Sequence, residues 1–478
     1  MRLKSIRAWA FGFQIAFSLA VVTMPQAAWA DLSFSSAKGT PGKLEILVID
    51  EETKAPLAGA DVKLSDANQF LKKEIKTTAA GTAQFVLNWS AREKNIHVSK
   101  AGYAGVSILG FKSWNVKISL QAQNPIKEVF HLQGNLRGWD DSSDGDYVHG
   151  GAILPALSAA ALPDFDAFAL LSKEMDSFKL FGNHNIPANS MIPDQRFFGL
   201  IHLNKETYRL SVSPGATNST IAVFQGAIPN RSLFKAFQSG HGFSYDLINQ
   251  FSISKIGFRQ GVELDHDLRL DFETPTELKT MHAMRITPPP FKSHVFAIAV
   301  TDLGLERQEW IPTDIKMMIN QDHFDHVENV SLKSGNFGYE HGVISLAQTP
   351  DRRQVSLIIT APAPAEVHPG EFLKPVDLTG YQTALPKTVS VSAPKNGLSV
   401  AVFKSKTSPN EKAITWTVYS LSPRAEFNLA DLANGGTTQE FEQTLLEFSP
   451  DFDEGNLDGH TIVKSISRVA RSSVTLKP

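Results

Sequence analysis

The sequence predicts a mainly β protein, with an N-terminal β-sandwich followed by one or more antiparallel β-rich domains and few short helices. Phenylalanine is frequent, with 31 residues, and lies among many runs of Val, Ile and Thr, which are residue types that favour strands. Apolar and charged residues alternate along Val262 to Phe272, a pattern typical of an antiparallel strand with one solvated face. Short helices are expected only near residues 156–161 and over Gln439 to Phe448, where Phe441, Leu445 and Phe448 share one helical face.

The length of the chain predicts several domains. Its 478 residues exceed one ordinary domain, and 42% hydrophobic residues with 20% charged residues provide material for packed cores. Pro288 to Pro290 form a stiff break, and the Ala/Pro run at 361–365 reads as an extended linker. We therefore expect a linker at 31–42, a β-sandwich at 43–123, a β-rich domain at 124–290, and another at 291–478 that divides further near 361–370.

Residues 1–30 have the features of a secretory signal peptide. Three cations occur within the first seven residues, residues 8–22 are largely apolar, and Ala28 and Ala30 are the small residues that a signal peptidase reads before Asp31. An N-terminal membrane anchor is the alternative, but the apolar run is shorter than the roughly 20 residues needed to span a bilayer. We expect an exported protein, periplasmic or secreted, with no transmembrane segment after the signal peptide.

The composition excludes several classes of site. The chain contains no cysteine, so disulfides, a thiol nucleophile, cysteine metal sites and an acylated cysteine are all excluded. The formal net charge is -3 and no basic stripe occurs, which argues against a nucleic-acid partner. Phosphate loops and dinucleotide fingerprints are missing as well, so no nucleotide partner is expected.

The segment Lys43 to Gln121 carries the most specific pattern in the chain. An apolar strand at 44–49 is followed by a charged turn and then by Pro56-Leu57-Ala58-Gly59-Ala60-Asp61-Val62. Gly59 permits a backbone conformation that a Cβ atom would hinder. The alternation of Ala60, Val62 and Leu64 with Asp61 and Lys63 predicts a half-buried strand.

These residues resemble the carboxypeptidase regulatory-like domain, a transthyretin-like β-sandwich. The matching positions continue with Gly81 before the Phe85 strand, and with Gly102-Tyr103 at the end of a further strand. The segment departs from the family at Ile49-Asp50, where a Gly is common, and at the turn Thr78 to Gly81. The resemblance implies a β-sandwich fold and a role as an accessory module, and it carries over no catalytic residue.

Two histidines form the sharpest candidate metal cluster. His323, Asp325 and His326 are metal-ligand types within a short segment, and they are similar to the second half of the His-x-His-x-Asp-His motif of metallo-β-lactamase-type hydrolases. Gln321 stands where the first histidine of that motif should be, and the surroundings lack the alternating strands and helices of that fold. A polar loop between strands is the alternative interpretation.

An acidic loop is a candidate Ca²⁺ site. Asp140, Ser142, Asp144 and Asp146 place oxygen ligands at alternate positions around a glycine, as at the start of a Ca²⁺ loop. Gly151 occupies the position at which a bidentate acid is expected, so an acidic surface turn is the alternative. The acidic segment 451–459 is similar. Ca²⁺ is therefore the cofactor expected at the acidic loops, and Zn²⁺ or another divalent ion is the one expected at the histidine cluster.

Taken together, these patterns favour binding over catalysis. No Gly-x-Ser-x-Gly nucleophile elbow occurs. Trp114, Trp139 and Tyr147 could stack on sugar rings or pack in a core. We expect a non-catalytic binding or scaffolding protein at the cell envelope or outside the cell, with an envelope polysaccharide or protein as partner. The alternatives are a secreted hydrolase with an unrecognised site, which a metal could assist, and a structural envelope component that uses the sandwich as a spacer.

Overall fold

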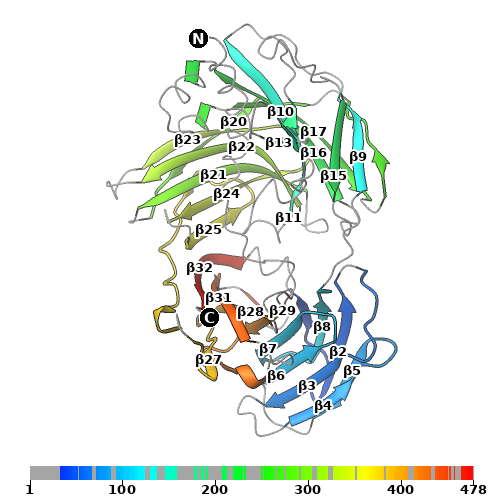
Figure 1. Ribbon diagram of the computed structural model, residues 1–478. Helices are drawn as coiled ribbons and strands as arrows, with labels where there is room; N and C mark the ends of the chain where they lie inside the picture. The colour runs from blue at the N-terminus through cyan, green and yellow to red at the C-terminus, as the bar shows by residue number, and fades with distance from the viewer. Residues whose placement is uncertain are drawn as a thin grey trace. The chain divides into compact units, whose positions relative to one another are not determined.

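The structure is a computed structural model of the chain. It describes residues 33–51, 53–66, 72–87, 93–123, 130–136, 146–158, 177–179, 185–187, 190–191, 207–212, 219–229, 231–232, 249–250, 252–263, 266–273, 276–289, 292–303, 309–320, 327–349, 353–381, 384–406, 414–431, 437–450, 452–453, 457 and 465–476. The fold is mainly β, which confirms the predicted fold class (Figure 1). Within these residues no helix is long and apolar enough to cross a bilayer.

The chain forms two compact units that do not follow the order of the sequence. The first contains Lys127–Ala347 and Ile358–Pro369, and the second contains Ala30–Ile126, Gln348–Leu357 and Gly370–Pro478. This grouping differs from the successive segments 43–123, 124–290 and 291–478 expected from the sequence. The N-terminal sandwich and the last hundred residues belong to one unit.

The N-terminal sandwich of the second unit consists of two four-strand layers. One layer has the order β1 (Phe34–Ala37), β8 (Asn115–Leu120), β2 (Lys43–Asp50) and β5 (Thr82–Val86). The other has the order β4 (Lys72–Lys76), β3 (Asp61–Asp66), β6 (Lys94–Ser99) and β7 (Gly105–Phe111). Fully buried apolar side chains fill the space between the layers: Leu44, Ile46, Val48, Val62, Leu64, Phe85, Ile96 and Val98. Gly59 has φ +70°, as the sequence predicts for the turn before β3.

The second layer of the sandwich continues into the C-terminal part of the chain. Strand β7 pairs in parallel with β29 (Ile414–Ser420), and the sheet continues through β28 (Gly397–Lys406), β31 (Thr437–Phe448) and β32 (Ile466–Thr475). The start of β25 (Gln354–Thr360) pairs with β32. Figure 1 shows β6, β7, β29 and β28 following one another in this order. The N-terminal sandwich is therefore joined to the C-terminal part by main-chain hydrogen bonds, and β7 is an interior strand.

A second, smaller layer covers the C-terminal part of this sheet. It contains the hairpin-like pair β27 (Thr388–Ser390) and β30 (Glu426–Asn428), with 3-10 turns η4 (Thr379–Tyr381) and η5 (Leu429–Asp431) nearby. Apolar residues of this layer and of the sheet form one core cluster. The cluster contains Leu109, Leu378, Val389, Val391, Ala401, Phe403, Trp416, Val418, Ala425, Phe427 and Phe441.

The prediction of a helix over Gln439 to Phe448 is wrong, because this segment is part of strand β31. Strand β31 pairs with β28 on one side and with β32 on the other. Phe441, Leu446 and Phe448 are buried, whereas Leu445 of the predicted helical face is only partly buried. Two flanking strands outweigh the local helix propensity of the glutamates in this segment. Of the short helix expected near 156–161, Leu157–Ser158 form strand β11, and residues 159–161 lie outside the described residues.

The first unit contains several sheets, in which most neighbouring strands are antiparallel. One has the order β14 (Ser190–Met191), β10 (Tyr147–Pro155), β16 (Ser219–Pro229), β17 (Ser252–Val262) and β19 (Thr276–Glu277). Strands β11, β22 (Glu309–Asn320), β21 (Ser293–Asp302) and β24 (Glu340–Gln348) lie side by side in another. Two further sheets have three strands each. One has the order β23 (Glu328–Ser334), β20 (Thr280–Ile286) and β26 (Glu366–Val367), and the other has the order β15 (Thr207–Val212), β9 (Phe130–Asn135) and β18 (Leu268–Arg269). A two-stranded sheet consists of β12 (Ser177–Lys179) and β13 (Asn185–Pro187).

The prediction of one strand with a solvated face over Val262 to Phe272 is wrong. Strand β17 ends at Val262, and only the short strand β18 follows, which pairs in parallel with β9. The alternating acids have a structural use that the pattern does not reveal. The Asp267 carboxylate accepts the backbone N–H of His131 at 2.8 Å, and the Asp271 carboxylate accepts that of Asn135 at 2.8 Å.

Candidate functional site: a polar hollow on β3, β4 and β6

The predicted metal ligands fall largely outside the part of the chain that the structure describes. Asp140, Ser142 and Asp144 of the acidic loop, and His323, Asp325 and His326 of the histidine cluster, lie outside the described residues. Asp146 is exposed just before β10. Within the described part of the chain, no group of three or more His, Cys, Asp and Glu side chains could hold a metal ion. The Ca²⁺ site and the histidine metal site therefore stay predictions.

The aromatic residues considered for sugar stacking have different surroundings. The ring of Trp114 lies 3.9 Å from the Nζ atom of Lys94, measured to the ring centre, so it holds a cation–π contact within the protein. Tyr147 is 41% exposed at the start of β10. Trp139 lies outside the described residues.

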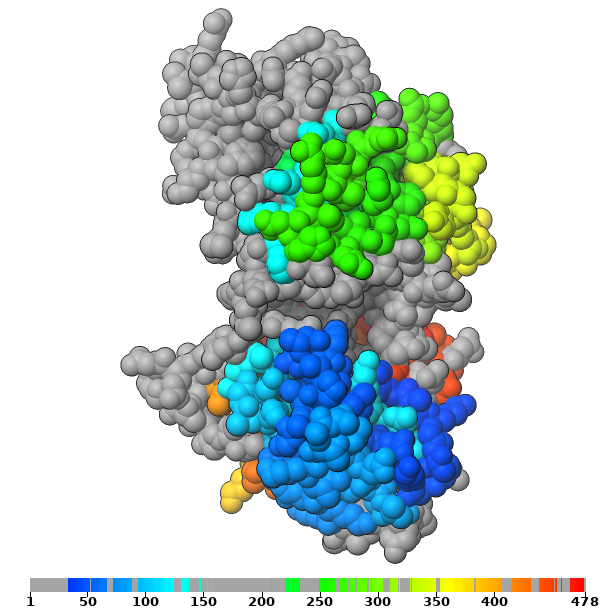
Figure 2. Space-filling model, turned by 90° about the vertical axis from the view of Figure 1, so that its right-hand side faces the viewer, coloured from blue at the N-terminus to red at the C-terminus, as the bar shows by residue number. Residues whose placement is uncertain are grey.

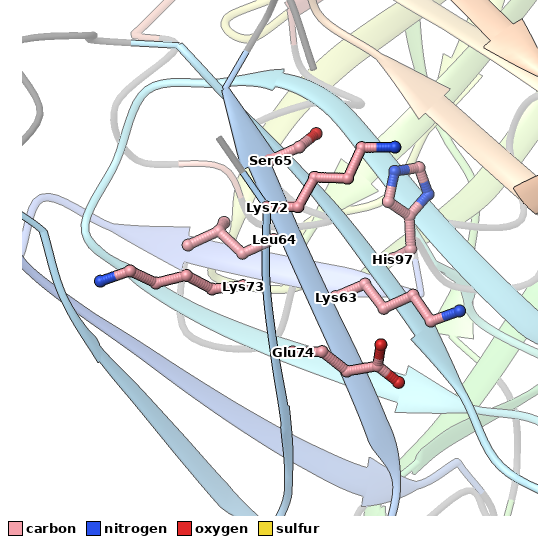
Figure 3. Close-up of a pocket in the computed structure, with 7 residues that line it drawn as sticks. All are labelled: Lys63, Leu64, Ser65, Lys72, Lys73, Glu74 and His97. Carbon is pink, nitrogen blue, oxygen red and sulfur yellow. The ribbon is translucent and has the colours of Figure 1, made fainter. Parts of the chain in front are cut away.

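A hollow of about 350 Å³ opens on the outer face of the N-terminal sandwich. Its lining comes from three neighbouring strands: Lys63, Leu64 and Ser65 of β3, Lys72, Lys73 and Glu74 of β4, and His97 of β6. Figure 3 shows Lys63, Lys72, Glu74 and His97 extending to one side of the sheet, whereas Lys73 extends to the other. We call this feature the polar hollow. Figure 2 shows in blue the broad surface that the N-terminal sandwich exposes on one face of the molecule.

Strand register explains why these side chains meet. Lys63 pairs with Glu74 on β4 and with His97 on β6, so the three side chains form one row across the sheet. Ser65 pairs with Lys72 in the adjacent row on the same face. Side chains directly opposite each other on antiparallel strands have Cβ atoms about 4.5–5.5 Å apart, so each row brings its members within reach of one another.

The first row ends in a buried hydrogen-bonded chain. His97 pairs with Ser107 on β7, and its Nδ1 atom lies 2.8 Å from the Ser107 hydroxyl. Ser107 is fully buried, and its Oγ atom accepts the indole N–H of Trp416 at 2.9 Å. A hydroxyl that accepts from Trp416 can donate to Nδ1 of a neutral His97, and this tautomer carries its proton on Nε2. The imidazole is thus oriented from the core side.

Lys63 and Lys72, whose side chains extend into the hollow, lack the hydrogen-bond or ion-pair partners that neighbouring lysines have in the described structure. Lys73, on the opposite face, donates to the carbonyl oxygen of Val86 at 2.8 Å, and Lys76 forms an ion pair with Asp61 at 2.8 Å. Lys63 and Lys72 are exposed, and neither forms an ion pair among the residues that the structure describes. The hollow therefore carries two lysines beside one carboxylate, Glu74.

The Ser65 hydroxyl lies on the outer face of β3, yet it is buried and has no hydrogen-bond partner among the described residues. Ser65 is 5% exposed, and its Oγ atom makes no hydrogen bond in the described structure. A buried polar atom without a partner costs about 1–3 kcal/mol, so most such atoms in proteins are satisfied by another group. Ser65 lies in the wall of the hollow, opposite the exposed Lys72 on β4.

These side chains suit binding better than catalysis. Ser107, the hydroxyl next to His97, is fully buried and already engaged with Trp416, so it is not placed to attack a substrate. Ser65 has no histidine as its cross-strand partner, since it pairs with Lys72 and Asn95. Lysine ammonium groups and a free hydroxyl are hydrogen-bond donors, which recognise an anionic or strongly accepting ligand.

Two polar clusters in the first unit have simpler interpretations. The Asp314 carboxylate is 1% exposed and accepts the backbone N–H groups of Ile315 and Lys333, each at 2.9 Å, while burial raises its pKa. It connects β22 to β23. The rings of His282 and His341 lie 6.0 Å apart, and burial followed by the charge of His282 lowers the pKa of His341. Two histidines supply fewer protein ligands than the three or four of a typical zinc site.

The sequence contains part of the signal for the polar hollow. The alternation predicts that Asp61 and Lys63 face solvent, and both lie on the outer face of β3. The cross-strand neighbours Lys72, Glu74 and His97 could not be assigned to the same face, because their register comes from strand pairing rather than from any local pattern.

Comparisons with known proteins give little further information. No protein-family model matches the sequence, and no curated protein is similar to it. The chain is similar to the solved structure of the Bacillus anthracis TIE protein, with 11% identity over 71% of this chain and 51% of that one and a TM-score of 0.14. It thus spans about half the length of that protein.

Two pilin structures give comparable values. The full-length major pilin SpaD from Corynebacterium diphtheriae is 9% identical over 69% of this chain and 96% of its own, with a TM-score of 0.15. BcpA, the major pilin subunit of Bacillus cereus, is 9% identical over 69% and 98%, also with a TM-score of 0.15.

Proposed function

We propose that this protein is exported and acts as a non-catalytic binding or scaffolding protein at the cell envelope or outside the cell. The observation that carries the proposal is the make-up of the polar hollow. On one side of the sheet it combines two exposed lysines with a buried hydroxyl (Figure 3), and among the described residues this hydroxyl has no hydrogen-bond partner and no accessible nucleophile lies next to a base. The signal-like residues 1–30 support export.

The rigid attachment of the hollow supports a scaffolding role. The strands that form it belong to a sheet that continues through β7 and β29 into the C-terminal part of the chain. Ladder hydrogen bonds hold β3 and β6 on both sides and the edge strand β4 on one side, so little ordering is required when a ligand binds. A site of this kind suits recognition of a polymer or a protein surface.

We also propose that residues 43–121 form a carboxypeptidase regulatory-like domain. The two-layer sandwich, the positive φ at Gly59 and Gly81, and the place of Phe85 in the core are consistent with this assignment. A family of accessory modules fits a protein that binds rather than catalyses. The fusion of β7 with β29 would be a feature of this chain.

The test is retention on envelope material. The protein without residues 1–30 is incubated with insoluble envelope fractions, which are used untreated, after protease digestion, or after periodate oxidation of their glycans. We expect retention on at least one fraction, and the treatment that abolishes it identifies a protein or a polysaccharide partner. Heat-denatured protein is the control for non-specific adsorption. Failure of the folded protein to be retained on any fraction would contradict the proposed function.

A further inference from the structure

We propose that the polar hollow binds a carboxylate group of an acidic polysaccharide, such as the uronate of a polyuronate chain. This inference rests on the proposed binding function and names the chemistry of its ligand. Three features of the hollow carry it: its charge, the Ser65 hydroxyl, and its position on an open face of the sheet.

The charge of the hollow fits one negative charge on the ligand. Lys63 and Lys72 contribute two positive charges, and Glu74 contributes one negative charge on the same face (Figure 3). The balance is one excess positive charge, which a carboxylate neutralises. A phosphate monoester, which carries between one and two negative charges near neutral pH, would leave excess negative charge beside Glu74.

The Ser65 hydroxyl supplies the direct hydrogen bond. It is buried and has no partner in the described structure, and it lies in the row next to Lys63, opposite Lys72. A carboxylate oxygen between the two lysine side chains would accept this O–H, and a small displacement of the flexible Lys72 side chain gives access to it. The ligand would thereby satisfy a polar atom that costs stability when it is left alone.

The open form of the hollow favours a polymer over a small molecule. The lining residues Lys63, Lys72 and Glu74 are exposed, so the hollow is a shallow opening on a sheet face rather than an enclosed cavity. Small-molecule pockets bury most of the surface of their ligand. A chain of sugar rings can place one carboxylate in the hollow and extend along the outer face of β3 and β4 on either side. Glu74 then disfavours a second negative charge in the same place.

The proposal is tested with a soluble polyuronate, polygalacturonate, as the probe. The tested variant is Lys63→Gln with Lys72→Gln, and the matched control is Lys117→Gln with Lys395→Gln. The control removes the same charge from two exposed lysines of the same unit that lie outside the hollow. We expect the hollow variant to bind about tenfold more weakly and the control to stay within about twofold of the wild type. Raising NaCl from about 0.05 M to about 0.5 M should weaken wild-type binding.

Ser65→Ala separates a ligand contact from a structural role. Because Ser65 has no hydrogen-bond partner among the described residues, its replacement should leave the unfolding midpoint unchanged or raise it, while polygalacturonate binding decreases. A decrease in the unfolding midpoint with unchanged binding would overturn the role given to this hydroxyl. Unfolding curves of all variants verify that they are folded.

Two further probes distinguish the sources of negative charge. Neutral dextran should not bind, and vesicles that contain phosphatidylglycerol should bind more weakly than polygalacturonate. Equal binding of dextran, stronger binding of the vesicles, equal losses in the hollow and control variants, or no binding of polygalacturonate by the wild type would each overturn the inference. If the hollow variant loses nothing on envelope fractions that retain the wild type, the inference fails and the proposed function stands.

Discussion

The outer face of one sheet layer in the N-terminal sandwich is exposed to solvent at one end and buried at the other. At the β4 end, the outer face carries Lys72 and Glu74, which are exposed to solvent. At the β7 end, the same face carries Gly105, Ser107 and Leu109, which lie beneath the C-terminal core. A single row of paired side chains shows the change, from exposed Glu74 and Lys63 through half-buried His97 to fully buried Ser107, Val418 and Ala401.

This difference shows how one face can serve two purposes. Where the face is covered, its residues become small or apolar, and the backbones approach closely. A Cβ atom on Gly105 would lie 2.1 Å from Cε3 of Trp416, so only glycine leaves room for this indole. Where the face is open, the residues become charged. His97 lies between the covered part and the open part of this face. It contacts Ser107 on one side and lines the hollow on the other.

The largest expected effect comes from Trp416→Ala, which removes the cover at the β7 end. Trp416 is 4% exposed and lies in the core cluster that joins the two parts of the second unit. Its loss should lower the free energy of unfolding by about 4 kcal/mol, measured by chemical denaturation. Trp416→Phe, which keeps a ring but removes the N–H donated to Ser107, should cost about 1–2 kcal/mol. Similar losses for both variants would contradict the role of the ring in packing.

A pH-dependent effect is expected at Lys94, the first residue of β6, which pairs with Phe111 of β7. Lys94 is fully buried, its ammonium donates to the carbonyl oxygen of Lys112 at 3.2 Å, and burial lowers its pKa from 10.5 to about 8. Between these two pH values the unfolded chain binds this proton and the folded chain does not. The free energy of unfolding should therefore rise with pH across this window, by at most about 3 kcal/mol for this group.

Lys94→Met isolates this contribution, because methionine keeps most of the apolar stem and has no proton to lose. The variant should be more stable than the wild type below pH 8, and its advantage should shrink as the pH approaches 10.5. Unfolding by denaturant at several pH values measures the difference between the two proteins. Parallel pH profiles across this window would show that Lys94 is not desolvated in the folded protein.

The sequence predicts the sandwich well because its signals are local. The alternation in β3 and the need for glycine at position 59 depend only on neighbouring residues. The joining of β7 to β29 has no such signal. Ser107 and Trp416 are 309 residues apart, and β7 is buried on both faces, so it lacks the alternation that marks a half-exposed strand.

The same limit explains the errors at β31 and at the polar hollow. Phe441 and Phe448 are spaced as on a helical face, and only the flanking strands β28 and β32 select the extended form. The alternation within its own strand predicts that Lys63 faces solvent. Its meeting with Lys72, Glu74 and Ser65 depends on register, which is set by pairing with other strands and cannot be read from one segment.

The smallest expected effect on stability lies at the open end of the sheet. Lys72→Gln should change the free energy of unfolding by less than about 0.5 kcal/mol, because Lys72 is exposed and forms no ion pair among the described residues. Denaturation measurements at low and high salt should agree for this variant. A loss of several kcal/mol would mean that Lys72 is part of the packed structure, and the open end would then resemble the covered one. A neutral result, together with weaker polygalacturonate binding, would identify Lys72 as a residue that stabilises the bound ligand rather than the fold.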